Sequence, residues 1–415
     1  MAMKPYCGVV TTGVLYASIL IALLVNLAVP AIAAKRAAAN KVAVSAPRIG
    51  SDPLSRSGFD HFYNMEYDKA IHDFELDAQQ HPEDPFAANH LLTAVLFKEL
   101  YRIGALDTEI YASDSFLSVR QFSPDPQVRQ RIRELTDQAL TLSERRLQAN
   151  PNDVQALYAR AATRATHSTT MALLDKSWFS ALRYAIGARH DDERVLDLDP
   201  NYTDAKTALG TDYYVLGSLS LAAKVAASVV GLSGNKQKGL KYLYEAANGG
   251  GETSVDAKIV LALFLRREQR YPEAINVVAA LTRDYPHSFL FALEYANLLN
   301  AAGHGPEAIA AFRKILTKSG QYQDPKLEQA AWGLGEALRG QNDFSDAAEA
   351  YESVGRFSRV EPDLLARANL AAGQMYDLLQ KRDFAVQKYR QVIAADADSP
   401  HADQARKYLK RPYHM

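Results

Sequence analysis

The stretch that decides the fold lies near the middle of the chain. It reads Asp197-Leu198-Asp199-Pro200-Asn201-Tyr202-Thr203-Asp204-Ala205-Lys206-Thr207-Ala208-Leu209-Gly210-Thr211-Asp212-Tyr213-Tyr214. Pro200 cannot donate a backbone hydrogen bond and restrains the preceding residue to extended angles, so a helix is predicted to end near Leu198. Asn201 or Thr203 can cap the next helix. In that helix Gly210 and Tyr213 share a face, where a small residue lets a neighbouring helix approach closely.

The same helix–turn–helix pattern recurs along the chain. Second helices are marked by Ala70-x3-Phe74, Ala274-x3-Val278, Ala308-x3-Phe312, Ala347-x3-Tyr351 and Ala385-x3-Tyr389. Ala274 and Ala308 are 34 residues apart, and matching first helices carry Leu334-Gly335 and Gly373-x2-Tyr376. These residues resemble the tetratricopeptide-repeat family. The resemblance implies an all-α fold, an α-solenoid wound as a right-handed superhelix of antiparallel helical hairpins, whose concave side is lined by first helices and commonly binds peptides.

The repeats are less regular before Gly249-Gly250-Gly251 than after it. We predict an irregular helical region at residues 53–250, with an insertion at 104–126, followed by a regular array at 251–410 that ends in a polar capping helix. Residues 214–312 are similar, more weakly, to the eukaryotic tetratricopeptide-39 and inclusion-body-clearance family. The similarity includes Tyr214-Val215-Leu216-Gly217 and Val230-Gly231-Leu232-Ser233-Gly234-Asn235, and it implies architecture alone.

The N-terminus carries an export or anchoring segment. Residues 5–34 have no charged side chain, and Ala31-Ile32-Ala33 has the small-x-small form of a signal-peptidase site, with cleavage expected before Ala34. A retained membrane anchor at residues 8–29 is the alternative, since the apolar stretch can span a bilayer and Lys35 follows it. Residues 1–33 are thus predicted to be a signal peptide or anchor, and residues 34–52 a flexible linker. Either way the protein is expected to be exported, periplasmic or otherwise extracytoplasmic.

Composition and motifs argue against several function classes. Lys and Arg total 47 against 48 Asp and Glu, so no net basic field attracts nucleic acid. Cys7 is the only cysteine and precedes the apolar run, which leaves a mature chain without thiols. Neither hydrolase, zinc-protease, phosphate-loop nor dinucleotide motifs occur. We predict no enzyme, no catalytic residues, no metal site and no cofactor.

Two histidine patterns have competing interpretations. His72, His81 and His90 recur at intervals of nine residues, but Pro82 and Pro85 break any helix joining them, so we interpret the spacing as coincidence. His190-Asp191-Asp192-Glu193 could suggest a cation site. Adjacent helical positions point about 100 degrees apart, so the four side chains cannot converge, and a solvated face is the favoured interpretation.

A partner-binding groove can be inferred from the repeat geometry. When Ala274, Ala308, Ala347 and Ala385 are set as equivalent, the first-helix positions facing the concave side are Arg266, Asn297, Asn300, Trp332, Glu336, Arg339, Arg367, Gln374 and Asp377. Aromatic and Arg side chains dominate binding hot spots, although Trp332 is alternatively a packing residue of the repeat. The set of Lys and Asn residues with which some proteins of this family bind the carboxylate of a chaperone tail is not reproduced in this sequence.

Two functional hypotheses follow. The first is a non-enzymatic scaffold or adaptor at the cell envelope that binds a protein or peptide in this groove, with possible membrane association through the N-terminal segment. The second is a small-ligand or lipid-binding helical protein that uses residues 215–232 and the insertion at 104–126. Residues 215–232 read as one continuing apolar helix, packed in the core or touching a membrane, with Lys224 as their only charge.

Overall fold

The computed structural model describes residues 52–106, 123–229, 231–323, 325–358 and 360–415, and the regular structure in these ranges is helical. The contacts divide the chain into a first unit up to Leu281 and a second unit from Thr282. The turn Gly249-Gly250-Gly251 lies within the first unit, where Gly251 packs against Asp204. Residues 34–51 of the predicted linker and residues 107–122 of the predicted insertion lie outside the described residues.

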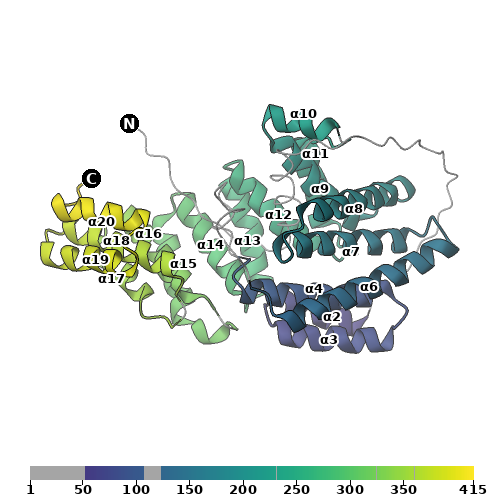
Figure 1. Ribbon diagram of the computed structural model, residues 1–415, viewed down its shortest axis with the longest axis horizontal. Helices are drawn as coiled ribbons and strands as arrows, with labels where there is room; N and C mark the ends of the chain where they lie inside the picture. Colours follow the sequence, from purple (N-terminus) through teal and green to yellow (C-terminus); the bar gives the residue numbers. More distant parts are fainter. Residues whose placement is uncertain (1–51, 107–122, 230, 324, 359) are drawn as a thin grey trace. The chain divides into compact units, whose positions relative to one another are not determined.

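Figure 1 labels the helices of both units. The first unit contains α2 (Pro53–Tyr63), α3 (Tyr67–Gln80), α4 (Pro85–Arg102), α6 (Pro126–Ala149), α7 (Val154–Leu173), α8 (Trp178–Leu198), α9 (Thr203–Ser218), α10 (Leu221–Val229), α11 (Lys236–Asn248) and α12 (Ser254–Arg267). Helix α13 (Tyr271–Asp284) includes the division. The second unit contains α14 (Phe289–Ala301), α15 (Gly305–Thr317), α16 (Leu327–Gly340), α17 (Phe344–Val354), α18 (Pro362–Leu378), α19 (Arg382–Ala395) and α20 (Pro400–Lys410).

Consecutive helices pack as antiparallel hairpins, which confirms the predicted all-α architecture. Closely packed pairs include α2 with α3, α4 with α6, α7 with α8, α9 with α11, α14 with α15, α16 with α17 and α18 with α19. The short helix α10 stands between α9 and α11 in the chain and barely contacts α9. The pairing of neighbours in sequence is the organisation expected of a helical-repeat protein.

One type of turn closes five of the hairpins. The second residue after the first helix has a positive φ, and the N–H of the residue that follows it donates to the carbonyl five residues earlier, as in Asp343 N to Leu338 O at 3.0 Å. This is the Schellman motif, which satisfies the last carbonyls of a helix. The positive-φ residues are Met65, Gln269, Gly303, Asn342 and Gln380.

Small residues bring the two helices of a hairpin together. Ala274, Ala308, Ala347 and Ala385 are fully buried, as the pattern predicts. In three hairpins a first-helix glycine lies beneath an aromatic ring of the second helix: Gly58 beneath Phe74, Gly335 beneath Tyr351, and Gly373 beneath Tyr389. A methyl group on Gly335 would lie 2.5 Å from Tyr351 Cε1, closer than atoms can approach.

The stretch quoted at the outset folds as a helix junction, with two corrections. Helix α8 ends at Leu198 and α9 begins at Thr203, but neither Asn201 nor Thr203 is the cap. The N-cap is Tyr202, which makes no side-chain capping bond, while Asp199 Oδ1 accepts a hydrogen bond from Asn201 N at 3.0 Å. The fully buried tyrosine is Tyr214, not Tyr213.

Glycines on both helices permit the close approach of α9 and α11. A Cβ on Gly210 would lie 3.0 Å from Gly239 O, and one on Gly239 would lie 2.6 Å from Gly210 O. Tyr214 stacks on Phe264 of α12, with 3.7 Å between ring centroids. The predicted tight contact at Gly210 is therefore present, and its partner is another glycine.

The prediction of one continuing helix after Tyr214 is wrong. Helix α9 ends at Ser218 because the returning chain packs against its end, where Asn235 N donates to Tyr213 O at 2.8 Å. The separate helix α10 exposes Leu221 by 80% and Val225 by 59%, so these residues are not in the core. Among the residues described, none of the helices has the length and apolar character needed to cross a membrane.

The solvated-face interpretation of residues 190–193 is also wrong for two of the four. Asp191 is buried and accepts hydrogen bonds from Arg160 at 2.7 and 2.9 Å and from Arg164 at 2.6 Å. Asp192 is also buried, and burial holds the pKa of its carboxyl well above the usual range. The side chains do point in different directions, as the helical geometry requires.

Other carboxyl groups of the first unit are likewise held away from water. Burial raises the pKa of Asp256 to about 7, and the nearby carboxylates of Glu252 and Asp204 add to the shift. A hydrogen bond from Tyr63 Oη to Asp256 Oδ2, 2.9 Å long, opposes it. Burial also raises the pKa of Asp212 to about 6. At neutral pH these buried carboxyl groups lower the free energy of unfolding of the first unit, because the unfolded chain ionises them more readily than the folded chain does.

The glycine beneath Tyr351 can be tested against a glycine in the same helix. We expect Gly335→Ala to lower the free energy of unfolding by about 1–3 kcal/mol, because the added methyl collides with a buried ring. Gly340→Ala, which meets nothing within 4 Å, should leave it unchanged or raise it by up to about 1 kcal/mol. Urea denaturation of the full chain measures both. Equal effects would contradict the packing described.

The pKa of Asp256 predicts how stability depends on pH. Between the unfolded pKa of about 4 and the folded pKa, the folded state holds a proton that the unfolded state has lost, so stability declines as pH rises. Asp256→Asn removes this titration. Its melting temperature relative to the parent chain should therefore rise progressively between about pH 5 and about pH 8. A difference in melting temperature that is constant across this range would show that Asp256 does not titrate there.

Candidate functional site

Trp332 is the centre of the candidate site in the second unit. The guanidinium carbon of Arg367, on α18, lies 4.6 Å from the centroid of the Trp332 ring, on α16. Tyr351 of α17 packs on the same tryptophan, with 5.2 Å between ring centroids. Trp332 is partly buried and also packs against the core around Val354. One part of the ring thus packs inward, as the packing interpretation predicts, and another supports Arg367. The role of Trp332 in partner binding stays a prediction.

Glu336 and Arg339 continue the site one turn along α16. Tyr351 Oη donates to Glu336 Oε1 at 2.5 Å, and Arg339 Nη2 donates to Glu336 Oε2 at 3.0 Å. Burial would lower the pKa of Arg339, but the charge of Glu336 raises it above its ordinary value. Burial raises the pKa of Tyr351 well above its usual range. Arg339 thus remains a cation, with its side chain 40% exposed.

Asp377 on α18 is buried within a network of its own. Tyr389 Oη donates to Asp377 Oδ2 at 2.8 Å, and Arg382 Nη1 approaches both carboxylate oxygens at 2.8 and 3.1 Å. Arg382 also donates to the carbonyls of Tyr408 and Leu409, which ties the end of α20 to α18. This carboxylate is therefore saturated by the protein and does not present a free charge.

A backbone segment already lies on this face of α18. Tyr413 N donates to Asp377 Oδ2 at 2.8 Å, and the Tyr413 ring packs against Tyr408 with 5.3 Å between centroids. The charge of Arg339 on α16 also interacts with Tyr413. The segment after α20, residues 411–415, thus occupies part of the surface predicted to hold a ligand.

The remaining predicted groove residues do not join the cluster around Trp332. Asn297, Asn300 and Gln374 are partly exposed on α14 and α18. Arg266 belongs to the first unit and is 8% exposed, so its guanidinium does not lie on an open surface. The residues brought together are Trp332, Glu336, Arg339 and Arg367, with Asp377 on the same helix as Arg367. Sequence reasoning missed Tyr351, Tyr389 and Tyr413, whose hydroxyl and backbone groups engage the acids.

Two other regions, a hollow on α19 and the alternative site at 215–232 and 104–126, show fewer features of a binding site. A surface hollow of about 580 Å³ is lined by residues of α19 alone, including Asp383, Gln387 and Arg390. A depression over one helix cannot enclose a ligand. For the alternative site at 215–232 and 104–126, the described part presents Leu221 and Val225 to solvent, and residues 107–122 lie outside the description.

Comparisons with known proteins find similarity to several solved structures. No protein-family model matches the chain, and no curated protein sequence matches it. Solved structures that align with it include a tetratricopeptide-repeat protein from Parabacteroides merdae (14% identity, 76% of this chain, 97% of that chain, TM-score 0.33). Others are PilF of Pseudomonas aeruginosa (14%, 59%, 98%, 0.36) and yeast Tom70 (13%, 87%, 89%, 0.39). The hairpin turns, the small-residue contacts and the pairing of successive helices are those of a tetratricopeptide-repeat fold.

Proposed function

We propose that the protein is a non-enzymatic scaffold that binds an extended segment of a partner protein across α16 and α18 of the second unit. The observation that carries the proposal is the position of the chain's own residues 411–415. Tyr413 lies on this face with its backbone N–H on Asp377, as the backbone of a bound peptide would. A partner segment would displace these residues or extend alongside them.

The chemistry of the surface indicates what the partner offers. Tyrosine hydroxyls and arginines engage Glu336 and Asp377. Arg339, which pairs with Glu336, and Arg367, whose Nη1 lies 3.9 Å from Asp363 Oδ2, have side chains 40% and 28% exposed. Trp332 supports Arg367 from beneath and holds its planar group in position. Arginine pre-oriented in this way favours carboxylates, so the proposed ligand is a peptide with acidic side chains.

We further propose that the protein acts outside the cytoplasm. Support comes from the charge-free residues 5–34 and from Ala31-Ile32-Ala33 at their end. A partner would then be an envelope protein, or a membrane protein if the N-terminal segment is retained as an anchor.

Peptide binding can be measured directly. Panning a random twelve-residue peptide library against the full chain should enrich acidic peptides. Arg367→Ala should weaken their binding by about tenfold or more, because truncating a hot-spot residue typically costs about 2 kcal/mol or more and about 1.4 kcal/mol is a factor of ten. Removing residues 411–415 should strengthen binding, since Tyr413 no longer competes for the surface.

The matched control is Arg390→Ala, which removes the same charge from an exposed position on α19. It should leave binding unchanged, and circular dichroism should show that all variants keep their helical content. Enriched peptides that bind equally well to the Arg367 and Arg390 variants would move the site elsewhere. A library without enriched peptides would count against the scaffold function itself.

The processing of the N-terminus tests the location. After expression in a cell with a secretory pathway, mass spectrometry should find a first residue of Ala34 if the signal is cleaved. An intact N-terminus in the membrane fraction would instead establish the anchor at residues 8–29. An intact chain recovered only from the cytosol would refute both forms of the proposal.

A further inference from the structure

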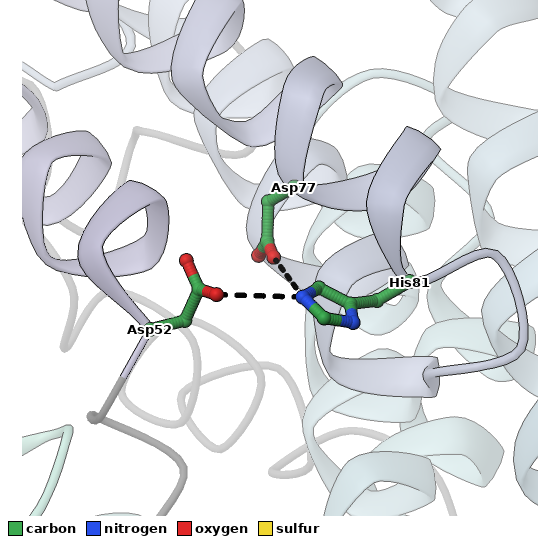
Figure 2. A group of neighbouring side chains, drawn as sticks. All are labelled: Asp52, Asp77 and His81. Carbon is green, nitrogen blue, oxygen red and sulfur yellow. Dashed lines mark hydrogen bonds and ion pairs between the residues drawn. The ribbon is translucent and has the colours of Figure 1, made fainter.

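Three side chains at one end of the first hairpin converge in the arrangement of a metal site. Asp52 is the N-cap of α2, Asp77 belongs to the last turn of α3, and His81 follows α3 as its C-cap. One ligand atom from each lies within 4.8 Å of the others. Figure 2 shows both carboxylates turned toward the same ring nitrogen of His81. Two carboxylates and one imidazole form a ligand set suited to divalent transition metals.

The carboxylate oxygens not directed at His81 hold these side chains in place. Asp52 Oδ1 accepts from Leu54 N at 2.7 Å, which is the helix-capping bond. Asp77 Oδ2 accepts from the buried hydroxyl of Ser55 at 2.8 Å. Each aspartate therefore keeps one oxygen for a cation and uses the other as an anchor. Such outer hydrogen bonds orient the ligands of known metal sites.

His81 pairs with both carboxylates at separations that are long for charged hydrogen bonds and close to those around a bound metal ion. His81 Nε2 lies 3.4 Å from Asp52 Oδ2 and 3.8 Å from Asp77 Oδ1. A strong charged hydrogen bond would bring these atoms to about 2.8 Å. Around a tetrahedral zinc ion, with bonds of about 2.0–2.1 Å, neighbouring ligand atoms stand roughly 3.4 Å apart.

A second histidine, which is buried, approaches the other oxygen of the Asp77 carboxylate. His90 on α4 is 5% exposed, and its Nδ1 lies 3.8 Å from Asp77 Oδ2 without a hydrogen-bond partner. Its other nitrogen, Nε2, lies 2.9 Å from Glu252 Oε1. The hydrogen bond to Glu252 fixes the ring, so that Nδ1 is directed at Asp77. Of the three histidines spaced nine residues apart, His72 and His90 thus differ in their surroundings. His90 reaches Asp77 with His81, whereas His72 does not belong to the group.

We propose that Asp52, Asp77 and His81 bind one divalent transition cation, of which Zn²⁺ is the type, with His90 supporting Asp77 from the buried side. Three protein ligands leave a coordination position, and His81 is 47% exposed, so water completes the coordination. The cation would tie the start of α2 to the end of α3. This inference is independent of the peptide surface in the second unit.

Zinc titration of the full chain, without an affinity tag and freed of metal by chelator, tests the proposal. Calorimetry should give about one Zn²⁺ per chain, and Zn²⁺ should raise the melting temperature. His81→Ala should weaken binding by about tenfold or more and abolish the thermal shift. Asp52→Asn should do likewise while still capping α2, because asparagine is an equally good N-cap.

The matched control is His72→Ala, an exposed histidine in the same helix. It should bind Zn²⁺ as the parent chain does, which separates a specific site from weak binding to surface histidines. Cobalt substitution gives an independent readout, since tetrahedral Co²⁺ has intense visible absorption that His81→Ala should remove. Failure of the parent chain to bind Zn²⁺, or unchanged binding in His81→Ala, would overturn the proposal.

Discussion

Close approach of two helices within each hairpin is the constraint on which the structure depends. Glycine on the first helix and alanine on the second leave room for the two backbones to approach. An aromatic ring of the second helix then covers the glycine, as Tyr351 covers Gly335. Dispersion contacts weaken steeply with distance, so a hairpin held apart by even one methyl group loses much of its packing energy. The positions of Trp332, Glu336 and Arg339 follow from this contact. They share α16 with Gly335, and Tyr351 itself holds Glu336.

The two units use charge differently. In the second unit, buried acids such as Asp377 are satisfied by tyrosine hydroxyls and arginine. In the first unit, Asp191 is neutralised by two arginines, but Asp256 has a tyrosine hydroxyl and further carboxylates nearby. Groups held in an unfavourable environment are often retained for a purpose other than stability. The cluster at Asp77 belongs to the same unit, and there two histidines, His81 and His90, face the carboxylate.

The hairpins were predictable because their determinants are local. Alanine, glycine and aromatic residues at helical spacing specify which faces meet, and the positions around Ala347 and Ala385 packed as expected. The end of α9 was not predictable, since it depends on Asn235 returning from elsewhere to pack on it. The same holds for Asp191, whose two arginines come from α7, and for Tyr413 on Asp377. Each of these contacts joins residues whose proximity is set by the assembled fold and leaves no periodic pattern in the sequence.

The Schellman turns have a consequence for how the protein acquires its structure and how its gene can change. Each of these turns is stabilised by hydrogen bonds between residues only a few positions apart, so a hairpin can close before distant parts of the chain are available. Folding can then begin at several hairpins and spread to their neighbours. For the same reason, duplication or loss of a whole hairpin preserves every turn bond in the remainder. Evolution can lengthen or shorten such a chain in units of one hairpin without redesigning its core.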